Sequence, residues 1–232
     1  MAEERAGIIA GDRTPLRSEL MLHITDSRRR QALLGAVAML IGFALPVRTD
    51  AAEVDPAVAA IRAFYDALLA AMKQADRLGV RGRYDKLAPV IRSTFDLAAM
   101  TRIAVGPDWP AIPPEQQTAL LDAFARMTIA TYANRFDGWS GQSFEVDAEV
   151  LPRNTGRIVR TKLVRPKEEP VTLNYLMRGT GDNWKIVDIY LSGTISELAT
   201  QRSEFGTILK GGGPAALIES LRQQIDKLMK KA

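Results

Sequence analysis

The side chains that most often carry acid–base or nucleophilic chemistry are nearly absent from this sequence. Its 232 residues include one histidine, His23, and no cysteine. Thiol nucleophiles, Cys-based metal sites and Cys-His catalytic pairs are therefore excluded, and a Ser-His-Asp triad could draw only on His23. Acid–base chemistry would fall to a carboxylate, a lysine or a tyrosine. The candidate set is Asp188, inside a predicted strand, with Tyr175 or Tyr190.

The N-terminus has the pattern of a cleaved signal peptide. Three arginines, Arg28 to Arg30, precede an uncharged apolar run at 32–45, and Thr49 and Ala51 are small residues three and one before a cut. The run is shorter than the ~20 residues of a membrane-spanning helix. We expect residues 1–51 to be removed, with Met1 or Met21 as the start, and 52–232 to form one domain. His23 would be lost with the signal, and export would place the domain in the periplasm.

The charge of the predicted mature chain is small. Residues 1–51 hold 7 of the 31 Lys and Arg and 6 of the 27 Asp and Glu, which leaves 24 and 21, a net charge of +3. This is no nucleic-acid-binding footprint. It would weakly favour transient contact with an anionic membrane surface.

Hydrophobic spacing predicts helices, then an antiparallel sheet, then helices again. Spacings of three and four, with Asp, Pro and Gly at the ends, predict helices at 56–78, 83–94, 97–105 and 114–135. Alternation predicts strands at 144–150, 157–164, 171–177 and 184–191. Thr194 and Glu197 form a capping box for a helix that ends near Lys210, and Pro214 starts the last one. We expect an α+β fold with a four-stranded or slightly larger twisted antiparallel sheet.

The apolar faces of these elements could close on a solid core or on a pocket. They are rich in Phe, Tyr and Met, which adapt to irregular space and offer a polar tip at a pocket mouth. The inward residues that would line a pocket are Phe64, Tyr65, Leu68, Met127, Tyr132, Val146, Leu173, Tyr175 and Ile186. Spacing alone favours a plain core.

Two stretches of the sequence carry distinctive motifs. The first is FDLAAMTRIAVGPDW, Phe95 to Trp109, and the second is WKIVDIYLSGTISELATQRSEF, Trp184 to Phe205. Both resemble the MlaC family of periplasmic lipid-shuttling and toluene-tolerance proteins. The second stretch, together with YANRFDGWSG at 132–141 and VTLNYLMR at 171–178, is similar to the hopanoid-associated HpnM branch.

The resemblance implies an apolar pocket between sheet and helices that holds a lipid without any cofactor. The cargo would be a phospholipid or a hopanoid, carried between membranes or to a membrane transporter of the ABC type. Arg202 matches a motif position and would contact a head group or tie the last helices to the rest of the domain; Trp109 would serve packing. Two alternatives stay open: a small pocket enzyme that uses Asp188 and a tyrosine, and a cargo-free adaptor of an envelope complex.

Overall fold

Helices α1, α2 and α3 form the first part of the domain. The computed structural model describes residues 54–154 and 156–230, so the predicted signal peptide lies outside the described residues. These helices span Pro56–Met72, Ala75–Thr94 and Leu97–Val105. Asp55 caps α1 and Asp96 caps α3, each accepting a backbone N–H at 2.9 Å, because a carboxylate at this position satisfies an otherwise unpaired helical N–H.

The turn between α1 and α2 comes earlier than the sequence predicted. The first helix was expected to reach Leu78-Gly79, but α1 ends at Met72 and α2 runs from Ala75 through a backbone break at Gly79, where φ is 57°. The buried guanidinium of Arg83 explains the difference. It donates to the carbonyl oxygens of Ala75 at 3.1 Å and Ala133 at 2.8 Å, and so fastens the start of α2 to a later helix.

A short 3₁₀ helix, η1 (Gly106–Ala111), leads from α3 into the long helix α4 (Pro114–Arg135). Pro114 takes the first position of α4, where its missing N–H costs nothing. The chain then enters the sheet. Among the described residues no helix combines the length and the apolar composition needed to cross a membrane.

The sheet is an antiparallel meander with strand order β1-β2-β3-β4-β5. Its strands are β1 (Ser143–Arg153), β2 (Gly156–Arg165), β3 (Glu168–Thr180), β4 (Asn183–Leu191) and β5 (Ile195–Ser196). The four long strands contain the four predicted ones, and β5 adds two residues at the edge. The predicted α+β class and antiparallel sheet are therefore confirmed.

The last helix, α5, spans Glu197–Lys230, and its cap differs from the predicted one. Ser196, not Thr194, occupies the cap, and its hydroxyl accepts from the N–H of Ala199 at 2.9 Å. Pairing with β4 extends through Ser196 as β5, which delays the start of the helix. The helix breaks at Gly213, where φ is 69°, and Pro214 follows the break.

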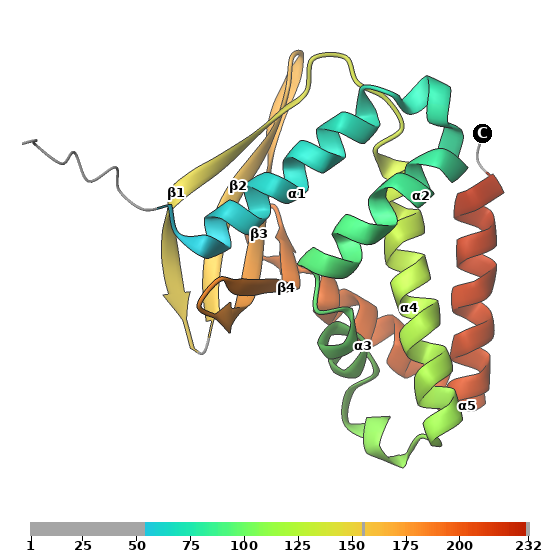
Figure 1. The fold of residues 1–232 in the computed structure, drawn as a ribbon. Helices are drawn as coiled ribbons and strands as arrows, with labels where there is room; N and C mark the ends of the chain where they lie inside the picture. The colour runs from blue at the N-terminus through green and yellow to red at the C-terminus, as the bar shows by residue number, and fades with distance from the viewer. Residues whose placement is uncertain (1–53, 155, 231–232) are drawn as a thin grey trace, which may run out of the picture. The chain divides into compact units, whose positions relative to one another are not determined.

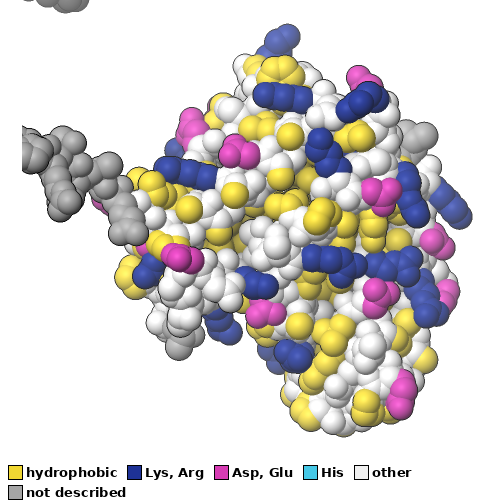
Figure 2. Space-filling model, in the orientation of Figure 1, with side chains coloured by type: hydrophobic (Ala, Val, Ile, Leu, Met, Phe, Trp, Pro, Cys, Tyr) yellow, Lys and Arg dark blue, Asp and Glu magenta, His cyan; other side chains and the backbone are white. Residues whose placement is uncertain are grey.

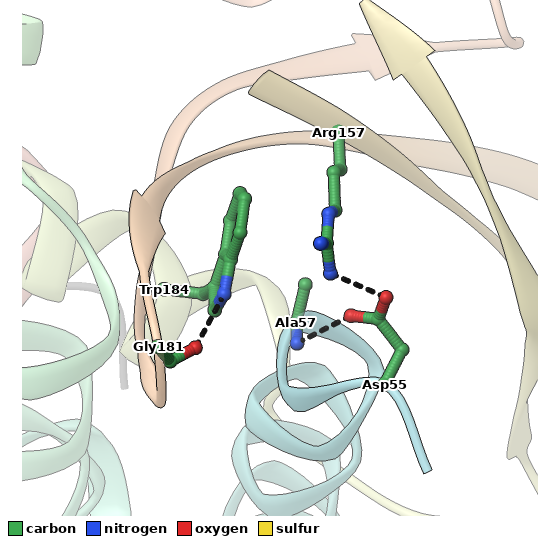
Figure 3. A network of polar contacts seen from close by, with 5 residues as sticks. All are labelled: Asp55, Ala57, Arg157, Gly181 and Trp184. Carbon is green, nitrogen blue, oxygen red and sulfur yellow. Dashed lines mark hydrogen bonds and ion pairs between the residues drawn. The ribbon is translucent and has the colours of Figure 1, made fainter. Parts of the chain in front are cut away.

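The start of α1 is tied to the sheet by a stacked ion pair. Asp55 caps the helix with one carboxylate oxygen and binds the guanidinium of Arg157 on β2 with the other (Figure 3). The same guanidinium lies 4.3 Å from the ring centroid of Trp184 on β4, and the indole N–H donates to Gly181 O at 2.8 Å. This contact fixes where the first helix crosses the strands.

Helix α1 lies across the sheet, and α2, α4 and the second half of α5 form a layer beyond it (Figure 1). The inward residues of α1, including Phe64 and Leu68, are fully buried between the sheet and this helical layer. On the face drawn in Figure 2, Lys and Arg are interspersed with Asp and Glu rather than gathered into one field.

Candidate functional site

A cavity of about 110 Å³ lies where α4 and the start of α5 meet β3 and β4. Most of its lining is apolar, and the polar side chains come from the second half of α4, the first turns of α5 and Tyr175 on β3. The lining residues are Phe95, Met100, Thr128, Thr131, Tyr132, Arg135, Phe136, Leu173, Tyr175, Ile189, Leu191, Glu197, Leu198 and Gln201. This volume is smaller than the ~150 Å³ at which an apolar cavity accepts benzene. A larger apolar ligand therefore requires side chains to move.

Aromatic rings form the wall behind the cavity. Phe64 packs edge-on against Phe95 and Tyr132 at 5.3 and 5.4 Å between ring centroids. Tyr132 in turn stacks on Phe136 at 5.7 Å. Such contacts stabilise the fold beyond the burial of apolar area. Each aromatic side chain has only two rotatable bonds, so a ring changes position as one rigid group.

A buried hydroxyl cluster sits beside this wall. The Tyr65 hydroxyl is 2.6 Å from Thr161 Oγ1 and 3.0 Å from the Tyr175 hydroxyl, and Thr161 Oγ1 also donates to the carbonyl of Leu173. Burial raises the pKa of Tyr65 to about 12 and the pKa values of Tyr132 and Tyr175 well above their usual value. These phenols therefore remain neutral at physiological pH, and they bring hydrogen bonds but no charge to the cavity wall.

The nine residues predicted to line a pocket fall into three groups. Tyr132, Leu173 and Tyr175 line the cavity. Tyr65 and Val146 border a separate groove between α1 and β1, where Tyr65 stacks on Phe144 at 4.0 Å. The others are buried in the core and do not line the cavity: Phe64, Leu68, Met127 and Ile186.

Sequence reasoning missed Ile189 and Leu191 because of a bulge in β4. Met177 pairs with Ile186 and Leu176 with Asp188, so Val187 is an extra residue between them. Strict alternation from Ile186 would have placed Asp188 and Tyr190 on the cavity face. Because of the bulge, the residues after Val187 alternate between the two faces in the opposite sense, so Ile189 and Leu191 face the cavity. Phe95 and Met100, which were also missed, lie in the first of the two motif stretches, so that motif was the available signal.

Asp188 holds the start of α5 rather than facing the tyrosines. Its carboxylate accepts from the hydroxyl of Ser196 at 2.6 Å and from the N–H groups of Leu198 at 3.2 Å and Ile189 at 2.8 Å. It pairs with Leu176, whereas Tyr175 pairs with Ile189, and adjacent strand residues point to opposite faces. The structure therefore does not bring Asp188 and Tyr175 together.

Tyr190, the other phenol considered with Asp188, also lies off the cavity lining. The guanidinium of Arg153 is 5.4 Å from its ring centroid. No group of three or more potential metal ligands occurs among residues 54–154 and 156–230.

Arg202 lies outside the cavity and packs on the α3–η1 junction. Its Nε is 3.2 Å from the point where a side chain would begin at Gly106, whose φ is 83°. The Arg202 side chain is exposed. Trp109 is partly buried against the core, and Arg102 lies 6.0 Å from its ring centroid.

Comparisons with known proteins agree with this architecture. No curated protein matches the chain in sequence. A solved structure, the phospholipid-binding protein from Ralstonia solanacearum in complex with a phospholipid, is similar to it with a TM-score of 0.66 and 26% identity. The match covers 75% of this chain and 99% of that one. The family of MlaC proteins matches residues 62–223, more than half of the sequence, and the chain therefore belongs to the MlaC family.

Proposed function

We propose that this protein is a lipid carrier that holds the acyl part of a phospholipid in the cavity between α4, α5 and the sheet. Family membership and the phospholipid-bound neighbour both support lipid binding or transport. The observation that carries the proposal is the mainly apolar cavity at the junction of sheet and helices, in a fold whose solved relative was captured with a phospholipid.

The energetics explain why such a protein would be needed. Each methylene buried from water is worth about 0.8 kcal/mol, so a sixteen-carbon tail costs roughly 12 kcal/mol to expose. Spontaneous transfer between membranes is then very slow. A carrier needs only to offer comparable apolar burial, and no step of this task requires a cofactor or proton transfer.

Loading would require the cavity to widen, since about 110 Å³ is too small for an acyl chain. The side chains best placed to move are Tyr132 and Phe136, at the end of α4, because they line the cavity and stack on each other. The groove beside Tyr65 and Phe144 is a separate space. The Tyr65 hydroxyl lies 3.0 Å from that of Tyr175, which lines the cavity.

The setting of this activity is part of the proposal. Export by the N-terminal segment would place the carrier in the periplasm, where it would exchange lipid with a membrane or a membrane transporter during transient contact. A hopanoid cargo follows only from the similarity of the sequence motifs to the HpnM branch and stays a prediction. The phospholipid-bound neighbour favours a phospholipid.

The test is native mass spectrometry of the protein expressed as the full chain in a bacterial host and purified without detergent. We expect an adduct whose mass, after lipid extraction, matches a glycerophospholipid. A hopanoid mass from a hopanoid-producing host would keep the carrier function and change the cargo. A bare protein that also takes up no lipid from labelled vesicles would refute the carrier proposal and return attention to a cargo-free adaptor or an enzyme.

A further inference from the structure

The polar groups of the cavity form two short ladders, one on each of the helices at its edge. Thr131 and Arg135 are four residues apart on α4, and Glu197 and Gln201 are four residues apart on α5. Residues at this spacing lie above one another on one face of a helix. All four line the same cavity, so each ladder turns toward it, and the two ladders carry opposite charges.

Among the residues that the structure describes, neither charge has a protein partner. Within the described part of the chain, Arg135 and Glu197 make no ion pair, with each other or with other residues, and no side-chain hydrogen bond. Arg126, about two and a half turns before Arg135 on α4, contrasts with them because it pairs with Asp122 at 3.7 Å. The Arg135 side chain is exposed and that of Glu197 is half-buried, as expected at the mouth of a cavity.

Both charges line the cavity beside Tyr132 and influence its phenol. Burial dominates the raised pKa of Tyr132, but Arg135 lowers this pKa and Glu197 raises it, so both act on the same phenol. A ligand whose apolar part enters beside Tyr132 would therefore leave its polar end between a guanidinium and a carboxylate.

We propose that Arg135 and Glu197 form a head-group subsite that favours a zwitterionic phospholipid with a primary ammonium group, such as phosphatidylethanolamine. The guanidinium suits a phosphate, which accepts its forked N–H donors. The carboxylate suits an ammonium that can donate hydrogen bonds. Phosphatidylglycerol carries the same phosphate but a neutral glycerol in place of the ammonium, so it offers Glu197 no positive charge and leaves the phosphate charge uncompensated. This inference rests on the proposed carrier function.

The test is a competition for loading. The protein is incubated with vesicles made of equal amounts of phosphatidylethanolamine and phosphatidylglycerol with identical acyl chains. Native mass spectrometry then measures the ratio of the two lipids bound to the protein. We expect the wild type to enrich phosphatidylethanolamine about 1.4-fold to fivefold, the range for charge pairs that keep contact with water. Glu197→Gln should abolish this enrichment, and Arg135→Gln should lower the loading of both lipids.

Matched controls lie on the same helices. Glu204→Gln on α5 and Arg126→Gln on α4 change exposed residues outside the cavity lining, and both should load as the wild type does. Equal uptake of the two lipids by the wild type, or an unchanged ratio in Glu197→Gln, would overturn the subsite and leave the carrier intact. No uptake of either lipid by any form would overturn the carrier function itself.

Discussion

Replacing Asp188 with alanine should destabilise the protein and leave its lipid loading per folded molecule unchanged. The Asp188 side chain, 8% exposed, accepts from the Leu198 N–H and the Ser196 hydroxyl, and Ser196 in turn caps α5 by accepting from the Ala199 N–H. The carboxylate therefore supports two of the N–H groups that would otherwise be unpaired at the start of this helix.

The expected cost follows from these contacts. A buried donor left without an acceptor costs about 1–3 kcal/mol, and a negative charge at a helix N-terminus contributes about 0.3–1 kcal/mol. Because the Ser196 hydroxyl can rotate to another acceptor, it adds nothing to the sum, and we expect Asp188→Ala to lower the free energy of unfolding by about 1.3–4 kcal/mol. Asp188→Asn keeps one acceptor oxygen and should lose about 1–2 kcal/mol.

The assay is urea unfolding followed by circular dichroism, with Asp182→Ala as the control, because Asp182 is an exposed residue of the β3–β4 turn. The control should change the free energy of unfolding by less than about 0.5 kcal/mol. The reasoning would be refuted if Asp188→Ala were as stable as the control. It would also fail if the variant lost an activity while keeping its stability, since that result would support acid–base work by this carboxylate.

Two further predictions concern the tyrosine cluster and the α3–η1 junction. Burial raises the pKa of Tyr65 above its unfolded value, so its contribution to stability is complete below about pH 10 and falls by about 1.4 kcal/mol per pH unit as the pH rises from 10 to 12. Urea unfolding between pH 8 and 12 should show this decline, and Tyr65→Phe should make it less steep; equal slopes would contradict the assignment. Gly106 has a φ of 83° and faces Arg202 Nε at 3.2 Å, so Gly106→Ala should cost about 1–3 kcal/mol by thermal or urea unfolding. Gly211→Ala is the control, because Gly211 is exposed and a side chain there meets nothing within 4 Å. A similarly small loss of stability in both variants would contradict backbone strain at Gly106.

The sequence was sufficient for the order of the elements but not for every end of them. Alternation survives in the first half of β1, where Phe144 and Val146 are half-buried and the acidic residues between and after them are exposed. In β4 the bulge leaves Ile186, Val187 and Asp188 all buried. The end of α1 depended on Arg83, whose partners lie on α2 and just before the end of α4. A contact between residues 50 positions apart leaves no mark in the local spacing.

The cavity was only partly predictable for a similar reason. Tyr132, Leu173 and Tyr175 followed from helical and strand periodicity, but the bulge at Val187 changed which residues of β4 face inward. No local pattern around Val187 marks the extra residue, since a bulge is fixed by pairing with the neighbouring strand. Periodicity also could not separate a buried residue such as Phe64 from a cavity-lining one, because both lie on the apolar face.

The central claim is that lipid occupies this particular cavity, and a blocking variant tests it most directly. Leu191→Trp would place an indole in a space of about 110 Å³, while Leu151→Trp adds the same group at a residue that is 44% exposed on β1. With overpacking costs of about 1–3 kcal/mol, loading of phospholipid from labelled vesicles should fall by about fivefold to 150-fold in Leu191→Trp. It should stay at the wild-type level in Leu151→Trp, with both variants folded by circular dichroism. Equal loading of the two variants and the wild type would mean that the lipid binds elsewhere and would contradict the account.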